Sequence, residues 1–358
     1  MFEYLKNKKV LITITVSLLA VVVVTGLVIY NSYFGAPQAN AELEQVTVPL
    51  GSGDFSQLKN LLKEKGFIKS EIGFKLAYFK AIGVGLSATT CVDCHTPGAY
   101  KLSKSMTAWE LANAIKKGPY MRWVVIPEGF CKEQIAEIIA SELRWDKATK
   151  EKWITTYTSM KYEEIEGVYF PDTYLIPINE EPLAVADRLR AKFNEEFAPF
   201  AAEALKQNIK WDTLLKIASI VQREAAGKDD MSLIAGILWN RLLQGMKLEV
   251  DATIQYVRDD VIHYGEARYD KQPANYTSAG SWWEPIKPDD KNIASPYNTY
   301  RNKGLPPHPI ANPGLDAIQA VLEPTETECF FYLHDSAKQI HCAETYEEHE
   351  ANIEKYLK

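Results

Sequence analysis

The sequence predicts an α+β protein with an apolar helix at its N-terminus, a small α+β module and a larger mixed α+β domain. Three observations lead to this fold class. Residues 10–30 contain no charged side chain. Residues 46–120 read as strand, helix, helix, strand and helix in turn. Apolar patterns of helical period then continue to residue 358, interrupted by loops rich in Pro, Gly and aromatic residues.

The apolar run at 10–30 is long enough to cross a bilayer, which takes about 20 residues of helix. Lys6, Lys8 and Lys9 precede the run, and no Lys or Arg occurs between residues 31 and 57. The positive-inside rule therefore places residues 1–9 in the cytoplasm and the rest of the chain outside. A cleaved signal peptide is the alternative, but the run is too long for a typical one and lacks a good small-residue cleavage site. We therefore expect an uncleaved, single-pass anchor in the cell membrane.

Composition limits the remaining possibilities. The chain has 358 residues and a formal net charge of −7, so it has no basic surplus and no nucleic acid partner is expected. About 310 residues lie outside the predicted membrane segment, enough for two domains or one large one. We expect a cytoplasmic tail (1–9), a transmembrane anchor (10–30), a linker (31–45), a module (46–120) and a large domain (121–358).

The five cysteines allow several states. Cys91, Cys94 and His95 form the C-x-x-C-H pattern of c-type haem attachment. A local disulfide or free thiols fit the same residues, since the exterior permits disulfides, and no second axial ligand for haem is evident nearby. Cys329 and Cys342 flank a predicted hairpin and could also meet.

Capping residues and apolar spacing locate the individual elements. In the module we expect a strand from residue 46, helices within 54–66 and 70–82, a strand at 99–102 and a helix from 107 to 118. In the large domain we expect a strand at 122–126, helices at 132–143, 184–197, 211–227, 231–243, 315–322 and 346–357, and a hairpin of 329–333 with 339–343. Residues 166–174, 244–253 and 259–292 are expected to be turns and loops.

The helix predicted at 211–227 carries the main catalytic candidate, Glu224. Asp212 can cap this helix and Gly227 can end it. Its buried stripe is formed by apolar residues at helical spacing: Leu214, Ile217, Ala218, Val221 and Ala225. Glu224 lies at the edge of that stripe, where burial raises the pKa of a carboxyl and suits it to act as a general acid. The simpler interpretation is that Glu224 reaches solvent and pairs with a Lys or Arg.

Other catalytic chemistries find no support in the sequence. It contains no G-x-S-x-G, H-E-x-x-H or P-loop motif, and the six histidines show no zinc-ligand spacing. Serine hydrolases, metalloproteases and nucleotide-dependent enzymes are therefore not indicated. A partly buried carboxylic acid beside loops rich in Tyr, Trp and Asn suits cleavage of a glycosidic bond.

Five ordered blocks of the sequence have distinctive motifs. The central block, A-S-I-V-Q-R-E-A at 218–225, contains Glu224. N-R-L with G-M-K-L and D-A-T-I-Q-Y follows at 240–256, and Y-N-T-Y, G-L-P-P and N-P-G at 297–314. Upstream lie I-P-E-G at 126–129 and E-G-V-Y-F-P-D-T-Y at 166–174. Together these blocks resemble the endolytic murein transglycosylases (the MltG/YceG-like family).

This resemblance implies a LysM-like module at 46–120 and a transglycosylase domain at 121–358. It implies cleavage of MurNAc–GlcNAc bonds within glycan strands to leave 1,6-anhydroMurNAc ends, with Glu224 as general acid and base. The C6 hydroxyl of the sugar is the nucleophile, so neither a metal nor a cofactor is expected. Expected partners are peptidoglycan glycan strands, the membrane and peptidoglycan synthases. Candidate residues for the substrate groove are Asn240, Asp251, Thr253, Tyr297, Asn298 and Tyr300.

Three alternatives stay open from the sequence. A hydrolase using Glu224 with Asp251 or Asp172 would add water and give reducing ends. A non-catalytic scaffold would bind the cell wall through the anchor and the module. A haem protein would use the C-x-x-C-H turn for electron transfer. The chain also departs from the family at this turn, at His308, and in a longer loop around Trp282–Trp283.

Overall fold

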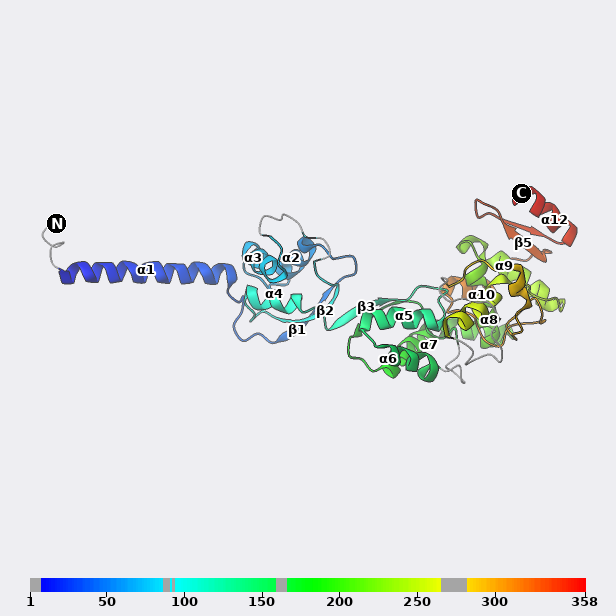
Figure 1. Ribbon diagram of the computed structural model, residues 1–358, viewed down its shortest axis with the longest axis horizontal. Coiled ribbons are helices and arrows are strands. Elements are labelled where there is room, and N and C mark those ends of the chain that lie inside the picture. The colour runs from blue at the N-terminus through cyan, green and yellow to red at the C-terminus, as the bar shows by residue number, and fades with distance from the viewer. Residues whose placement is uncertain (1–7, 86–90, 92–93, 159–165, 265–281) are drawn as a thin grey trace. The chain divides into compact units, whose positions relative to one another are not determined.

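The computed structural model describes residues 8–85, 91, 94–158, 166–264 and 282–358, and it divides into two compact units (Figure 1). The first unit comprises Met1–Trp123 and Tyr174–Asn179, and the second comprises Val124–Thr173 and Glu180–Lys358. The protein is therefore a mixed α+β protein, as the sequence predicts. The expected ranges of tail, anchor, linker, module and large domain stay predictions.

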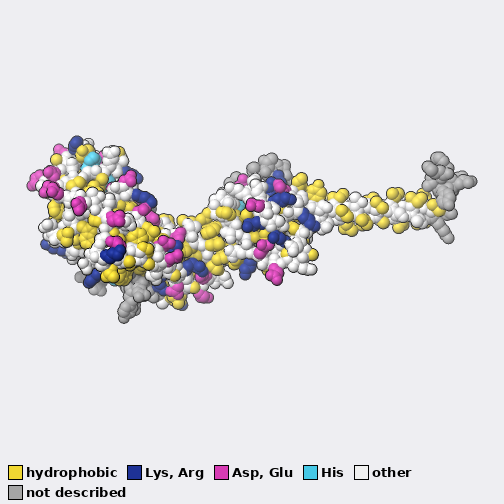
Figure 2. Space-filling view, turned by 180° about the vertical axis from the view of Figure 1, so that it is seen from behind, with side chains coloured by type: hydrophobic (Ala, Val, Ile, Leu, Met, Phe, Trp, Pro, Cys, Tyr) yellow, Lys and Arg dark blue, Asp and Glu magenta, His cyan; other side chains and the backbone are white. Residues whose placement is uncertain are grey.

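A long N-terminal helix, α1 (Lys8–Phe34), begins the described chain. Within it, Val10–Phe34 is an apolar stretch of 25 residues, none of it buried inside the protein. Figure 2 shows its surface as hydrophobic and uncharged along nearly its whole length. By length and composition this helix could cross a membrane, which fits the predicted anchor. It runs four residues past Tyr30, into the segment predicted as a linker.

The first unit packs three helices with antiparallel strands. Its elements are β1 (Leu43–Val48), α2 (Phe55–Glu64), α3 (Glu71–Ile82), β2 (Gly98–Ser103), α4 (Ala108–Lys116) and β3 (Met121–Val125). These three helices begin within the predicted ranges, because the side chains of Asp54, Ser70 and Thr107 accept hydrogen bonds from the first turns of α2, α3 and α4. The core is aromatic and includes the fully buried Phe74 and Tyr78.

The strands form one sheet in the order β1–β2–β3–β4, where β4 is Thr173–Pro177. Strands β1 and β2 pair from Leu43 opposite Ser103 to Val48 opposite Gly98. The prediction missed β4, because the end of E-G-V-Y-F-P-D-T-Y was assigned to a loop. Alternate residues of β4 are buried, but five residues give too short a pattern to recognise.

The second unit is largely helical. Its elements are α5 (Lys132–Leu143), α6 (Lys147–Lys152), a π-helical turn (Trp153–Tyr157), α7 (Pro182–Lys206), α8 (Trp211–Glu224), α9 (Lys228–Leu243), α10 (Asp251–Tyr264), a 3-10 turn (Pro288–Asn292), α11 (Leu315–Leu322), β5 (Phe331–His334), β6 (Ile340–Ala343) and α12 (Tyr346–Tyr356). Helices α8, α9 and α11 pack on one another, and the hairpin β5–β6 is confirmed. Two predictions were wrong: α7 is longer than 184–197, and α10 lies where a turn was expected. Much of the long loop predicted at 259–292 lies outside the described residues, which omit 265–281.

Helix α8 ends at Glu224, three residues before the predicted end at Gly227. Ala225 is already extended, with φ −68° and ψ 137°. The cause lies in the next helix, because the Asp230 carboxylate accepts hydrogen bonds from the backbone N–H groups of Ala226 (2.9 Å) and Gly227 (3.2 Å). Asp212 does not cap α8; its carboxylate pairs with Lys216 on the next turn.

Cys91 and Cys94 are free, so the local disulfide that the sequence allowed is not formed. The thiol of Cys94 donates a hydrogen bond to the carbonyl of Cys91 (3.2 Å). Burial raises the pKa of Cys94 to about 12, so this thiol is protonated at neutral pH.

Candidate active site

A pocket of about 260 Å³ in the second unit surrounds the carboxyl group of Glu224. Its walls come from segments that are far apart in the sequence: the end of α8, α9, the start of α10, the loop after residue 297, strand β5 and α12. The lining residues are Glu224, Arg241, Leu248, Glu249, Asp251, Tyr300, Phe331, Tyr332, Tyr346 and His349.

Both carboxyl oxygens of Glu224 accept hydrogen bonds. The hydroxyl of Tyr332 donates to Oε2 (2.7 Å), and the backbone N–H of Ala252 donates to Oε1 (3.3 Å). Burial raises the pKa of Glu224, and the negative charge of Asp251 adds to this effect, whereas the two hydrogen bonds lower the pKa. Burial dominates, so the carboxyl holds its proton to a higher pH than an ordinary Glu and can serve as a proton donor.

The last turn of α8 is fixed by contacts with three other segments. Gln222 accepts a hydrogen bond from the N–H of Gly314 (2.9 Å). The guanidinium of Arg223 lies over the ring of Trp283 (4.1 Å) and donates to the carbonyl of Gly129 (3.5 Å). The carboxyl of Glu128 lies against Gly314, 2.1 Å from the place that a Cβ at this position would take. The I-P-E-G, A-S-I-V-Q-R-E-A and N-P-G blocks therefore meet where Glu224 leaves the helix.

Three of the predicted site residues line the pocket together: Glu224, Asp251 and Tyr300. The hydroxyl of Tyr300 donates to Asp251 Oδ1 (2.5 Å). Burial and this carboxylate raise the pKa of Tyr300, so its hydroxyl stays protonated. Asp251 is exposed at the mouth of the pocket, where it can accept a hydrogen bond from a bound molecule.

Asn298 and Thr253 are fully buried and do not line the pocket. The Asn298 amide donates to the carbonyls of Lys291 (3.0 Å) and Ile293 (2.8 Å), and its oxygen accepts from the N–H of Tyr300 (3.0 Å). The hydroxyl of Thr253 donates to the carbonyl of Val250 and bonds to Thr299. These side chains shape the loop and helix start that present Tyr300 and Asp251.

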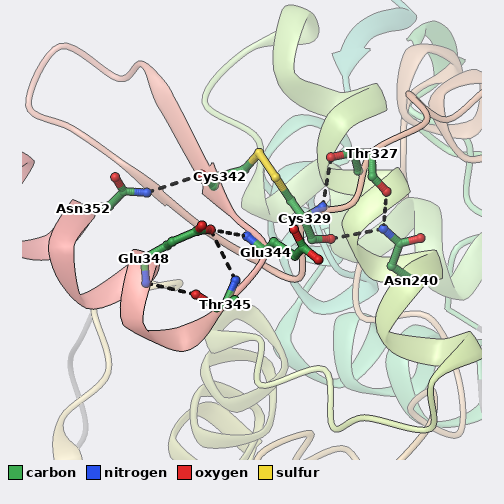
Figure 3. The surroundings of a disulfide bond; sticks show 8 residues. All are labelled: Asn240, Thr327, Cys329, Cys342, Glu344, Thr345, Glu348 and Asn352. Carbon is green, nitrogen blue, oxygen red and sulfur yellow. Dashed lines mark hydrogen bonds between the residues drawn. A yellow bond between two sulfur atoms is a disulfide. The ribbon is translucent and has the colours of Figure 1, made fainter.

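Asn240 and Tyr297 also lie outside the pocket lining. The amide of Asn240 donates to the carbonyls of Thr327 (2.7 Å) and Cys329 (3.1 Å), which ties α9 to the chain before β5 (Figure 3). The ring of Tyr297 is buried, with its centroid 5.4 Å from that of Tyr256.

A disulfide holds the hairpin that carries Tyr332. Cys329 and Cys342 are joined with their Cα atoms 5.8 Å apart, at the base of β5 and β6 (Figure 3). On β5, His334 Nε2 bonds to Asp230 Oδ2 (2.7 Å), which connects the strand to the start of α9. The disulfide therefore joins the two sides of the hairpin before Tyr332, and the bond from His334 to Asp230 attaches the hairpin to α9 after it.

Sequence reasoning missed most of the pocket wall. Tyr332 lies 108 residues after Glu224 and gave no signal beyond membership of a predicted strand. Arg241 belongs to the N-R-L block but was not selected. Its guanidinium donates to the carbonyl of Leu248 (2.8 Å) and lies over the Phe331 ring (5.0 Å), so it binds two walls together.

The sequence pattern described as the YceG-like family matches residues 46–355. The chain belongs to the YceG-like family. The match begins in β1 and ends in α12, so it includes every residue of the pocket, and it confirms the resemblance drawn from the five blocks.

Two proteins with sequences similar to this YceG-like chain carry the same name. An "Endolytic murein transglycosylase" of Bacillus subtilis is 29% identical over 337 residues, covering 87% of this chain and 84% of its own length. A Streptococcus pneumoniae protein of that name is 28% identical over 293 residues, covering 73% of this chain and 50% of its own. A crystal structure of a yceG-like protein from Listeria monocytogenes shares the fold, with a TM-score of 0.53 and 23% identity over 87% of this chain and 99% of that one.

Proposed function

We propose that this YceG-like chain is a peptidoglycan lytic transglycosylase, with Glu224 as its general acid and base. The observation that carries the proposal is the Glu224 carboxyl: it has a raised pKa, lies in an open pocket and is hydrogen-bonded at both oxygens. The names of the Bacillus and Streptococcus relatives support the same reaction class.

In the proposed reaction, protonated Glu224 donates its proton to the glycosidic oxygen between MurNAc and GlcNAc as that bond breaks. The resulting carboxylate accepts the proton of the MurNAc C6 hydroxyl, whose oxygen bonds to C1. The products are a 1,6-anhydroMurNAc end and a free GlcNAc hydroxyl, and Glu224 is again protonated. An intramolecular nucleophile is already close to C1, so no second protein carboxylate is required. Tyr332 and Ala252 stabilise the carboxylate form between the two proton transfers.

The site residues then divide by role. We assign Asp251 and Tyr300 to glycan contact, because both line the open pocket. The other four candidates act indirectly, by holding the backbone and rings around the pocket in place: Asn240, Thr253, Tyr297 and Asn298.

The chain's layout suggests where the enzyme works. We propose that α1 anchors it with the N-terminus in the cytoplasm and both units outside, and that the first unit is a LysM-like module. The order strand, helix, helix, strand and helix supports the module assignment. In this setting the enzyme would terminate or trim nascent glycan strands beside peptidoglycan synthases.

The test is digestion of purified peptidoglycan by the full chain in detergent, with products identified by mass spectrometry. Native protein is expected to release internal fragments that end in anhydroMurNAc. Glu224→Gln should release none while its thermal unfolding is unchanged, because the amide fills the same volume but donates no acidic proton. Glu203→Gln, on the exposed face of α7, is the matched control and should be active.

Other products would support one of the alternative functions. Reducing ends would indicate water as the nucleophile and Asp251 as a second carboxylate, since Asp251 shares the pocket with Glu224 whereas Asp172 does not line it. No product from native protein that still binds sacculi would favour a scaffold. Activity retained by Glu224→Gln would refute the assigned acid.

A further inference from the structure

We propose that the first unit rests on the membrane surface and binds anionic lipid headgroups through the face of α3 next to α1. This inference depends on α1 crossing a membrane. It is independent of the reaction catalysed in the pocket, because the headgroup-binding face and Glu224 belong to different units.

The end of α1 packs directly on α3 and α4 within the first unit (Figure 1). The ring of Phe34 stacks on that of Trp109 in α4, with centroids 5.3 Å apart. At Gly73 of α3 the backbones meet so closely that a Cβ would lie 1.9 Å from the carbonyl oxygen of Tyr33. Helix and module therefore form one packed body, and the distance of the module from the membrane is set by the helix.

That distance follows from helix geometry. If the apolar stretch from Val10 fills the hydrocarbon core with about 20 residues, it reaches the far edge of the core near Tyr30. Phe34 then lies about 6 Å further along the axis, at about 1.5 Å per residue. The headgroup layer on each side is about 5–8 Å thick. The residues that touch Tyr33 and Phe34, namely Gly73 and Trp109, therefore lie at headgroup level.

The α3 face at this level has the chemistry of a membrane interface. Ile72, Leu76 and Lys80 follow one another at four-residue spacing on the side of α3 that includes Gly73, and Lys69 lies just before the N-cap of this helix. Both lysines are exposed, and Ile72 is 62% exposed. An apolar side chain between two cations can enter the interface while the lysines bind phosphate groups.

Aromatic residues complete this surface. Tyr30 and Tyr33 on α1 are 53% and 41% exposed, in the position that interfacial tyrosines occupy at the ends of membrane helices. The Lys80 ammonium lies 5.7 Å from the centre of the Trp109 ring, so it is held beside the end of α1.

The charge distribution identifies anionic lipid as the partner. Residues 35–123 contain 11 Lys or Arg and 7 Asp or Glu, a net charge of +4. Residues 124–358 contain 26 Lys or Arg and 39 Asp or Glu, a net charge of −13. The module is thus basic in a chain that is acidic overall. Figure 2 shows Lys and Arg side chains gathered on the part of the module that adjoins the helix. An anionic surface therefore attracts the module and repels the rest of the chain.

The experiment places the full chain in nanodiscs of phosphatidylcholine alone or mixed with phosphatidylglycerol and measures hydrogen exchange of α3. We expect at least threefold slower exchange in the anionic discs, since each lysine at the surface strengthens binding about fivefold. Raising the salt until the Debye length falls from about 8 to about 3 Å should remove the difference.

Two double variants remove the same positive charge, one at the proposed headgroup-binding face and one away from it. Lys69→Gln with Lys80→Gln should abolish the dependence on phosphatidylglycerol. Lys116→Gln with Lys117→Gln, exposed at the far end of α4 from Trp109, should preserve it. Equal exchange in both kinds of disc for the native chain, or equal loss in both double variants, would overturn the proposal. Peptidoglycan digestion is measured separately and decides only the proposed reaction.

Discussion

Tyr332→Phe is expected to raise the pKa of Glu224. The Tyr332 hydroxyl donates a hydrogen bond of 2.7 Å to Oε2, which stabilises the carboxylate and lowers its pKa. A hydrogen bond to a charged group contributes about 1.5–3 kcal/mol. Since one pKa unit corresponds to about 1.4 kcal/mol, loss of the hydroxyl should raise the pKa by roughly one to two units.

The sign of the effect on activity follows from the proposed mechanism. Glu224 must be protonated to donate to the glycosidic oxygen, so activity falls as the pH rises through its pKa. Tyr332→Phe should therefore move the alkaline limb of the pH–rate profile to higher pH. Asp251→Asn should move it to lower pH, because the Asp251 charge raises the pKa of Glu224. Two variants of one pocket are thus expected to shift the same limb in opposite directions.

The assay is the initial rate of anhydroMurNAc release as a function of pH for native and variant proteins. The position of the limb reports the pKa separately from any change in the maximum rate. Tyr346→Phe is the control, because Tyr346 lines the pocket without taking part in the interactions that set the Glu224 pKa. Shifts of Tyr332→Phe and Asp251→Asn in the same direction, or no shift in either, would refute the reasoning.

Three further predictions concern stability. Burial raises the pKa of Glu166 from 4.5 to about 8, so between these pH values the folded protein binds a proton that the unfolded chain has lost. The free energy of unfolding should therefore fall as the pH rises from 4.5 to about 8. Urea titrations should show that Glu166→Gln removes this pH dependence. Cys329→Ser with Cys342→Ser removes a disulfide between residues 13 positions apart and should lower the free energy of unfolding by about 3 kcal/mol in denaturant titrations. Asn298→Ala leaves buried backbone groups without their partner, including the N–H of Tyr300, and should lower the melting temperature through a loss of about 2–4 kcal/mol in calorimetry.

Elements with local signals were predictable from the sequence. Helices α2, α3 and α4 begin within the predicted ranges, because Asp54, Ser70 and Thr107 each bond the first turn of their own helix and need no distant partner. The end of α8 was misplaced because the group that stops it, the carboxylate of Asp230, belongs to the following helix. Glycine at 227 looked like a sufficient stop signal, but tertiary hydrogen bonds end the helix earlier.

The pocket was predictable only in part. Glu224 was found from its place beside a buried stripe and from the block around it, and Asp251 and Tyr300 from their blocks. Tyr332 could not be found in this way. Strand periodicity predicts which residues of β5 share a face, but it does not predict which distant segment that face will contact. The hydrogen bond from Tyr332 to Glu224 joins segments 108 residues apart, so no local pattern in the sequence contains it.

The same reasoning explains why a motif residue need not touch the substrate. The pocket is built from loops and helix ends, which lack the regular hydrogen bonds of a helix or sheet interior. Their backbone groups must therefore be satisfied by side chains, and Asn298, Asn240 and Arg241 all donate to backbone carbonyls outside a regular helix or sheet. Loss of such a side chain should lower stability and activity together, whereas Glu224→Gln should lower activity alone. That contrast separates residues that hold the pocket from the residue that performs the chemistry.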